Sequence, residues 1–102
     1  MIKINNVKWE IYLVSPNHPE MRQPDGTWTI GACDWQTKGI YIVDNLDEAL
    51  TWKVLAHEIT HAAMFSYNVA MSAELEEFIA DLIATYGFEI IAQANKIFSR
   101  IT

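Results

Sequence analysis

The segment His57-Glu58-Ile59-Thr60-His61 constrains the fold of this chain more than any other part of the sequence. Two histidines four residues apart lie one above the other on a helix face, where both imidazoles can reach one metal ion at about 2.0–2.1 Å. Glu58 then flanks the ion without being a ligand, as a general base for an attacking water would. The pattern HExxH therefore predicts a helix carrying a zinc site, with His57 and His61 as ligands and Glu58 as the catalytic base.

The alternative is that both histidines are core residues. The same side of the predicted helix carries Leu50, Val54 and Phe65, and a histidine on an apolar face is more often a satisfied core residue than a ligand. Two histidines at helical spacing with a glutamate directly after the first are a narrower coincidence, so metal binding is the favoured interpretation.

The residues before this helix predict a small sheet. β-branched and aromatic residues concentrate in residues 7–14, 27–33 and 39–43, which predicts about three strands. Either of the last two is a candidate for the sheet edge along which a peptide substrate could pair as an extra strand.

The second half of the chain predicts two helices. The first is expected to begin after Asn45 or Asp47 and to end near Tyr67. Ser72 is a suitable cap for the second, and Gly87 is a point at which that helix could kink or break. The expected fold class is therefore α+β, a small sheet followed by two packed helices, in a single domain covering residues 1–102.

The second helix is expected to supply the third metal ligand. The connection around Val69 is so short that the two helices should pack as an antiparallel hairpin, in which residues equally far from the turn lie level. His61 and Glu77 are each eight residues from Val69, and His57 and Asp81 are each twelve. Glu77 is therefore the predicted third ligand, and Asp81 the predicted hydrogen-bond acceptor that fixes the tautomer of His57.

Neighbouring acidic residues offer alternatives. Glu74 is the next candidate ligand because it shares the helix face of Glu77, although it lies nearer the turn. Glu76 points about a third of a turn away from Glu77 and is not expected in the site. The alternative for Glu77 is a solvated carboxylate with no ligand role. The alternative for Asp81 is a simple salt bridge on the helix surface.

Composition narrows the possible partners and compartment. The net charge of −6, with seven scattered basic residues, argues against nucleic-acid binding. No run of apolar residues is long enough to span a membrane, and no apolar stretch near residue 1 is long enough for a signal peptide. The single cysteine, Cys33, forms no intrachain disulfide and suits a reducing compartment. We therefore expect a cytoplasmic protein without membrane or nucleic-acid partners.

The motif residues also resemble a known group of enzymes. His57–His61, followed by a helix with Glu77 and Asp81, resembles the gluzincin metallopeptidases, which pair HExxH with a later glutamate ligand. Within that class the chain is most similar to the small ImmA/IrrE-like peptidases of phages and prophages, whose second motif, E-x-x-A-[ND]-x-x-A, matches Glu77, Ala80, Asp81 and Ala84. The resemblance implies a zincin-like domain that binds Zn²⁺ and cleaves a protein or peptide, with a transcriptional repressor as one candidate substrate.

Three functions remain open from the sequence. The leading one is a zinc-dependent metallo-endopeptidase that uses metal-activated water. The second is a hydrolase of another class, since HExxH predicts the metal better than the substrate. The third is an interaction module of phage or prophage origin with a structural or latent zinc and no turnover, in which a fourth side chain would fill the metal position that an enzyme keeps open. A DNA-associated protease of the SprT-like type is disfavoured by the acidic charge and the single cysteine.

Overall fold

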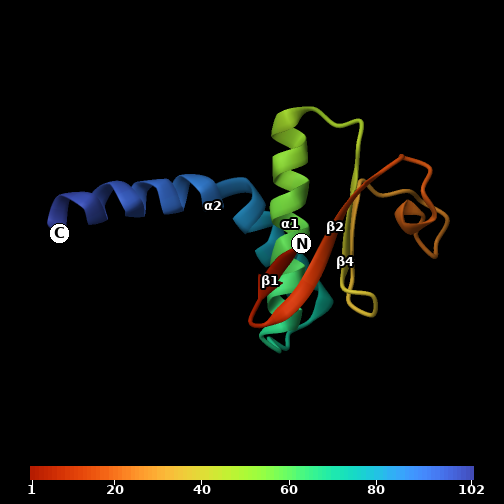
Figure 1. Ribbon diagram of the computed structural model, residues 1–102, viewed down its shortest axis with the longest axis horizontal. Helices are drawn as coiled ribbons and strands as arrows, with labels where there is room; N and C mark the ends of the chain where they lie inside the picture. The colour runs from red at the N-terminus through yellow and green to blue at the C-terminus, as the bar shows by residue number, and fades with distance from the viewer.

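The computed structural model describes all 102 residues and has the α+β architecture that the sequence predicts (Figure 1). The sheet has four strands rather than three, in the order β1-β2-β4-β3. The elements are β1 (Ile2–Ile4), β2 (Val7–Val14), a short 3₁₀ helix η1 (Pro19–Met21), β3 (Gly31–Asp34), β4 (Gly39–Val43), α1 (Glu48–Ser66) and α2 (Ala73–Ile101).

The strand missing from the prediction is β1. It pairs antiparallel with β2 through a two-residue turn, with Ile4 opposite Val7. Asn5 and Asn6 form this turn at φ values of 48° and 65°, and asparagine is among the residues that tolerate a left-handed backbone in such tight hairpins. The Asn5-Asn6 pair between the β-branched residues Ile4 and Val7 was therefore the sequence signal that could have indicated this hairpin.

The other three strands place β3 at one edge of the sheet. β2 and β4 pair in parallel, and β4 pairs antiparallel with β3, with Gly31 opposite Ile42. β3 begins at Gly31, so the prediction that its strand starts at Thr27 is wrong by four residues. The backbone N–H of Thr29 instead donates to the carbonyl of Met21, at 2.8 Å, which holds the preceding loop against η1.

Helix α1 covers one face of the sheet, as Figure 1 shows. Asp47 caps it and accepts a hydrogen bond from the backbone N–H of Leu50 at 2.8 Å, so Asp47 is the cap rather than Asn45. The core lies between this helix and the sheet, and its buried members are Trp9, Ile40, Ile42, Val54 and Ala62.

Helix α2 begins at the Ser72 cap and continues unbroken through Gly87. Its first part packs against α1, and the buried residues there are Ala80 and Ala84, whose small side chains let the two helices approach closely. The later turns of α2 run away from the rest of the chain to the C-terminus (Figure 1). Neither helix combines the length and the apolar character needed to cross a membrane.

Candidate metal centre

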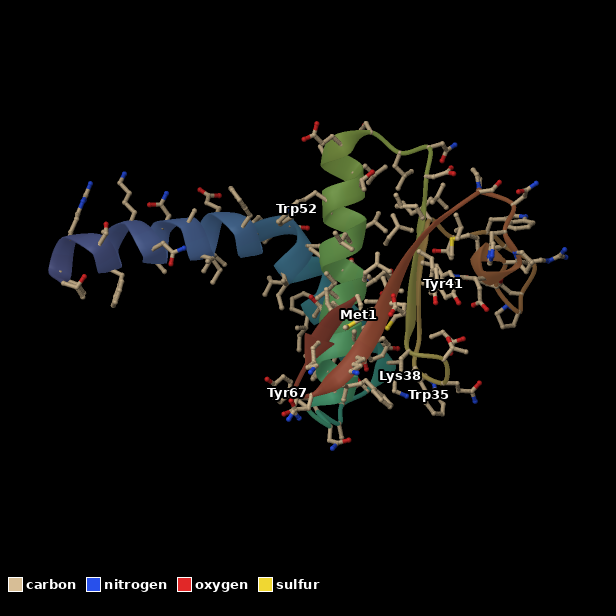
Figure 2. All side chains as sticks on the ribbon, in the orientation of Figure 1. Met1, Trp35, Lys38, Tyr41, Trp52 and Tyr67 are labelled. Atoms are coloured by element: carbon tan, nitrogen blue, oxygen red, sulfur yellow. The ribbon has the colours of Figure 1, made fainter.

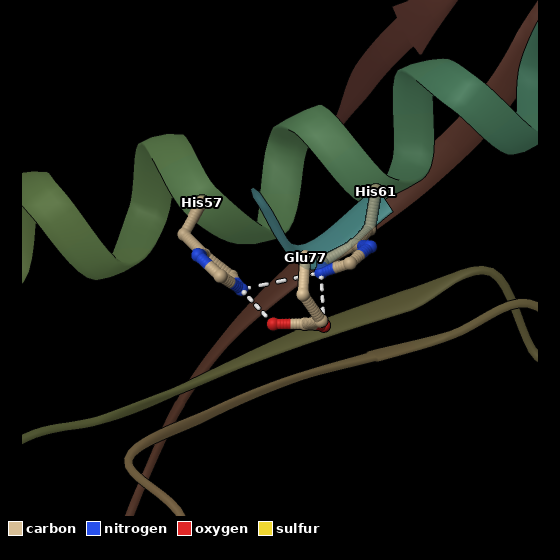
Figure 3. A group of neighbouring side chains, drawn as sticks. All are labelled: His57, His61 and Glu77. Atoms are coloured by element: carbon tan, nitrogen blue, oxygen red, sulfur yellow. Dashed lines mark hydrogen bonds and ion pairs between the residues drawn. The ribbon is translucent and has the colours of Figure 1, made fainter. Parts of the chain in front are cut away.

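The two helices bring His57, His61 and Glu77 together at one point, as the residue counting predicts (Figure 3). The Nε2 atoms of the two histidines lie 3.2 Å apart. The carboxylate of Glu77 bridges them, with Oε2 at 3.3 Å from Nε2 of His57 and Oε1 at 2.8 Å from Nε2 of His61. Three potential donor groups from α1 and α2 thus converge, and this cluster contains no fourth histidine, cysteine, aspartate or glutamate.

Each histidine also has a carboxylate at its other ring nitrogen. Oδ1 of Asp81 lies 3.0 Å from Nδ1 of His57, which is the pairing that the sequence predicts. Oε1 of Glu76 lies 2.7 Å from Nδ1 of His61. The expectation that Glu76 points away from the site is therefore wrong, because its side chain reaches His61 from the neighbouring helix position. Glu74, the alternative ligand, is exposed and does not belong to the cluster.

These contacts determine where the lone pairs of the histidines point. An ionised carboxylate only accepts hydrogen bonds, so the Nδ1 atoms of His57 and His61 act as the donors to Asp81 and Glu76. In a neutral imidazole the Nε2 atom then carries a lone pair, and both Nε2 atoms face each other and the Glu77 carboxylate. Converging lone pairs repel, so a proton or a metal cation has to lie among them.

The spacing of the donors suits a small tetrahedral ion. Ligands at about 2.0–2.1 Å from a tetrahedral zinc are about 3.3 Å from one another. In this cluster the two Nε2 atoms are 3.2 Å apart, and each has one oxygen of Glu77 nearby, Oε2 at 3.3 Å from His57 and Oε1 at 2.8 Å from His61. With a single oxygen of Glu77 as the donor, the three donor atoms lie within 4.8 Å of one another. Two imidazoles and one carboxylate are also a donor set that zinc prefers. The residues present therefore fit the metal that the motif implies.

Glu58 lies beside the cluster but outside it. Its side chain is buried, 8% exposed, next to His57 on α1. Burial raises the pKa of its carboxyl group, while the neighbouring histidines lower that pKa and Glu77 raises it again. A carboxyl group whose pKa is moved towards neutrality is suited to take up and release a proton.

The edge strand β3 approaches Glu58 closely because residue 31 is glycine. A Cβ atom added at Gly31 would lie 2.5 Å from Cγ1 of Val54 and 3.0 Å from Oε2 of Glu58. Any side chain at this position would therefore push β3 away from α1 or displace the Glu58 carboxylate.

Two open hollows adjoin the cluster, one on each side of Glu58. The first, of about 440 Å³, is lined by Glu58, His61, Glu76 and Glu77 together with four less polar residues, Cys33, Trp35, Phe65 and Val69. The second, of about 260 Å³, lies between β3 and α1 and includes Gly31, Lys53, His57, Glu58 and Asp81. Space for a ligand thus exists on both sides of the carboxylate.

Cys33 lines the first hollow as a protonated thiol. Burial raises its pKa to about 12, and the carboxylates of Glu58, Asp34 and Glu76 act in the same direction. A thiol with this pKa is neither a nucleophile nor a ready metal ligand at neutral pH.

Comparison of the chain with protein-family models, with curated proteins and with solved structures finds no match. A function for the cluster must therefore be inferred from its residues and their geometry.

Proposed function

We propose that this chain is a zinc-dependent metallopeptidase of the gluzincin type, with His57, His61 and Glu77 as ligands and Glu58 as the catalytic acid–base group. The observation that carries the proposal is the convergence of two Nε2 lone pairs and one carboxylate, with both Nδ1 atoms occupied by other carboxylates. This arrangement is stabilised by a proton or a metal cation among the converging atoms, and the donor set of two imidazoles and one carboxylate favours zinc.

The groups around the cluster support a role in hydrolysis. A zinc ion bound here would supply a Lewis acid that activates water and polarises a carbonyl group. Glu58 can accept a proton at its carboxylate and later donate it to the leaving amine, since its pKa is raised by burial and it opens on both hollows. Glu76 and Asp81 hold the two imidazoles in one tautomer and orientation.

The position of β3 supports a peptide as the substrate. β3 is an edge strand of the sheet and packs beside α1, so its outer edge is free to pair with an extended chain. The proposed substrate is accordingly a protein or peptide, with a transcriptional repressor as a candidate from the resemblance. A cytoplasmic location is part of the proposal and accords with the single cysteine.

The proposal is tested by measuring metal content and cleavage on the same variants. Purified chain without a histidine tag should hold about one zinc, and His57→Ala and Glu77→Ala should lose it. Glu58→Gln should keep the zinc but cleave an unfolded, fluorescence-quenched protein substrate at least about 100-fold more slowly. Glu74→Gln, which makes the same change in charge on α2, should behave as wild type in both assays.

Each outcome separates the candidate functions. Cleavage by Glu58→Gln at the wild-type rate would exclude the proposed role of this residue. Stoichiometric zinc without cleavage of any peptide substrate would favour the interaction module with a structural or latent metal. A wild-type chain that binds no zinc, even after zinc is added back, would return both histidines to structural roles.

A further inference from the structure

The last four turns of α2 carry large apolar side chains that are mostly uncovered, although the ring of Phe88 meets that of Trp52 edge to face, with 5.7 Å between the ring centroids. Beyond Gly87 every residue of this helix is exposed. Six of these residues are phenylalanine or isoleucine with 49–75% of their surface exposed, namely Phe88, Ile90, Ile91, Ile97, Phe98 and Ile101. Most helical stability in proteins comes from packing of an apolar face. We call residues 83–101 the α2 extension, and its surface requires a partner.

The apolar residues of the extension follow a heptad pattern. Positions separated alternately by four and three residues form one stripe along the helix, and this stripe consists of Ile83, Gly87, Ile90, Ala94, Ile97 and Ile101. Such a stripe is the seam of two helices that pack with interdigitating side chains. Ile91 and Phe98 widen it on one flank, and Gln93 and Arg100 border it on the other.

The seam is complementary to itself when two copies run antiparallel. Pairing that is centred near Ala92 sets Ile97 of each copy against Gly87 of the other, and Ile90 against Ala94. Large side chains thus face small ones in both inner layers, as close packing requires. The symmetry of such a pair repeats every contact twice, which is the mark of an interface between identical chains.

The exposed area also suits a dimer. At roughly 200 Å² for each large side chain, the five exposed residues on the stripe and its apolar flank (Ile90, Ile91, Ile97, Phe98 and Ile101) present about 600 Å² per copy. A stable interface of standard size buries about 800 Å² on each partner. An open hollow of about 550 Å³, lined by Trp52, Ala56, Ile83, Gly87 and Phe88 among others, lies where α2 leaves α1. Antiparallel pairing brings the end of the second copy, with Ile101, to this hollow beside Trp52, which Figure 2 labels.

The charge distribution favours the same arrangement. Twelve of the thirteen acidic residues precede Gly87, whereas residues 87–102 carry only Glu89, Lys96 and Arg100 as charged side chains. Antiparallel pairing keeps the two acidic bodies at opposite ends of the joined helices, and parallel pairing would crowd them together. The net charge of −6 likewise disfavours an anionic membrane surface as the partner.

We propose that the α2 extension is a dimerisation element that pairs antiparallel with the same segment of a second copy of this chain. The two clusters of His57, His61 and Glu77 then lie far apart, at opposite ends of the dimer. The inference does not depend on the proposed peptidase activity, because it rests on α2 beyond the site.

The mass of the chain in solution tests the association. Sedimentation of wild type at micromolar concentrations should give twice the 11.7 kDa of one chain. Ile97→Glu places a charge against Gly87 of the second copy and should give a monomer. Ile97 is half exposed in the single chain, so this variant should keep the wild-type thermal transition of the body. Arg100→Ser, on the polar flank, is the control and should remain dimeric.

Cysteine cross-linking tests the direction of pairing. In a Cys33→Ser background, Gln93→Cys lies almost on the proposed symmetry axis and should cross-link its own counterpart under a short bifunctional thiol reagent. Arg100→Cys lies about 24 Å along the helix axis from its counterpart in the antiparallel dimer, given 1.5 Å per residue, and should not cross-link. Cross-linking at Arg100→Cys, or no cross-linking at Gln93→Cys, would contradict antiparallel pairing and overturn the proposal.

Two further results would also overturn it. One is a wild-type chain that stays monomeric at all concentrations tested. The other is a monomer that binds vesicles of anionic phospholipid through residues 88–101, with binding lost in Ile97→Glu, since this would make a membrane surface the partner of the extension.

Discussion

Glu76 and Asp81 hold equivalent positions beside the cluster, each at the Nδ1 atom of one histidine. Their geometry predicts how much each would contribute to the affinity of the proposed zinc site. Each carboxylate accepts a hydrogen bond from the Nδ1 atom of one histidine, and loss of such a partner typically weakens metal binding about 10- to 100-fold. The Glu76 contact is the shorter, at 2.7 Å against 3.0 Å for Asp81. The Glu76 side chain is 32% exposed, whereas that of Asp81 is 70% exposed and better screened by water.

The expected order of effects follows from these differences. Glu76→Gln should raise the dissociation constant for zinc towards 100-fold, and Asp81→Asn should raise it towards 10-fold, which correspond to about 2.7 and 1.4 kcal/mol. The amide that replaces each carboxylate keeps an oxygen that can accept the hydrogen bond, but it loses the negative charge. The double variant should be close to additive, because the two carboxylates act on different histidines.

Competition with a fluorescent zinc chelator near neutral pH measures these constants. Glu74→Gln is the matched control, since it removes the same charge from the first turn of α2 at an exposed residue outside the cluster. A Glu76→Gln variant that binds zinc as tightly as Glu74→Gln would refute the reasoning. An effect of Asp81→Asn larger than that of Glu76→Gln would show that contact length and exposure do not set the order.

Two further predictions concern the neighbourhood of the site. Gly31→Ala should destabilise the metal-free protein by about 1–3 kcal/mol, because the added Cβ meets Val54 and Glu58. Thermal unfolding measures this loss, and an unchanged transition temperature would contradict the close approach of β3 to α1. Cys33, with a pKa of about 12, should react with iodoacetamide at pH 8 at least about 100-fold more slowly in the folded metal-free chain than in urea, with a rate that climbs as pH rises towards that pKa. Equal rates in the two states would refute the raised pKa.

The positions of Glu77 and Asp81 in the site could be predicted from the sequence because counting residues along a helical hairpin is a geometric argument. Once the turn is placed near Val69, the levels of Glu77 and Asp81 follow from the rise per residue, and both side chains lie where the count puts them. Ala80 and Ala84 are the buried residues of α2, and their small side chains let α1 come close enough for these contacts. The ligand roles of these residues remain predictions.

The parts that the sequence did not predict depend on short strands and on interactions between distant segments. β1 has three residues, too few for a periodic pattern, and it is identified only through the Asn5-Asn6 turn. The start of β3 is determined by contacts of the loop before it with η1, which no local pattern encodes. The close approach at Gly31 likewise depends on α1, more than twenty residues later.

The error over Glu76 has a different cause, which bears on how such sites are interpreted. A helical wheel gives the direction of the Cα–Cβ bond, and a third of a turn separates Glu76 from Glu77. A glutamate side chain reaches far enough to cancel that difference when the partner helix is close, and the small residues of α2 bring α1 close. His61 therefore lies between two consecutive glutamates, one at each ring nitrogen. With Glu58 and Asp81 added, four carboxylates surround two imidazoles, and the mutual repulsion of so much negative charge is the physical reason for expecting a cation at this point.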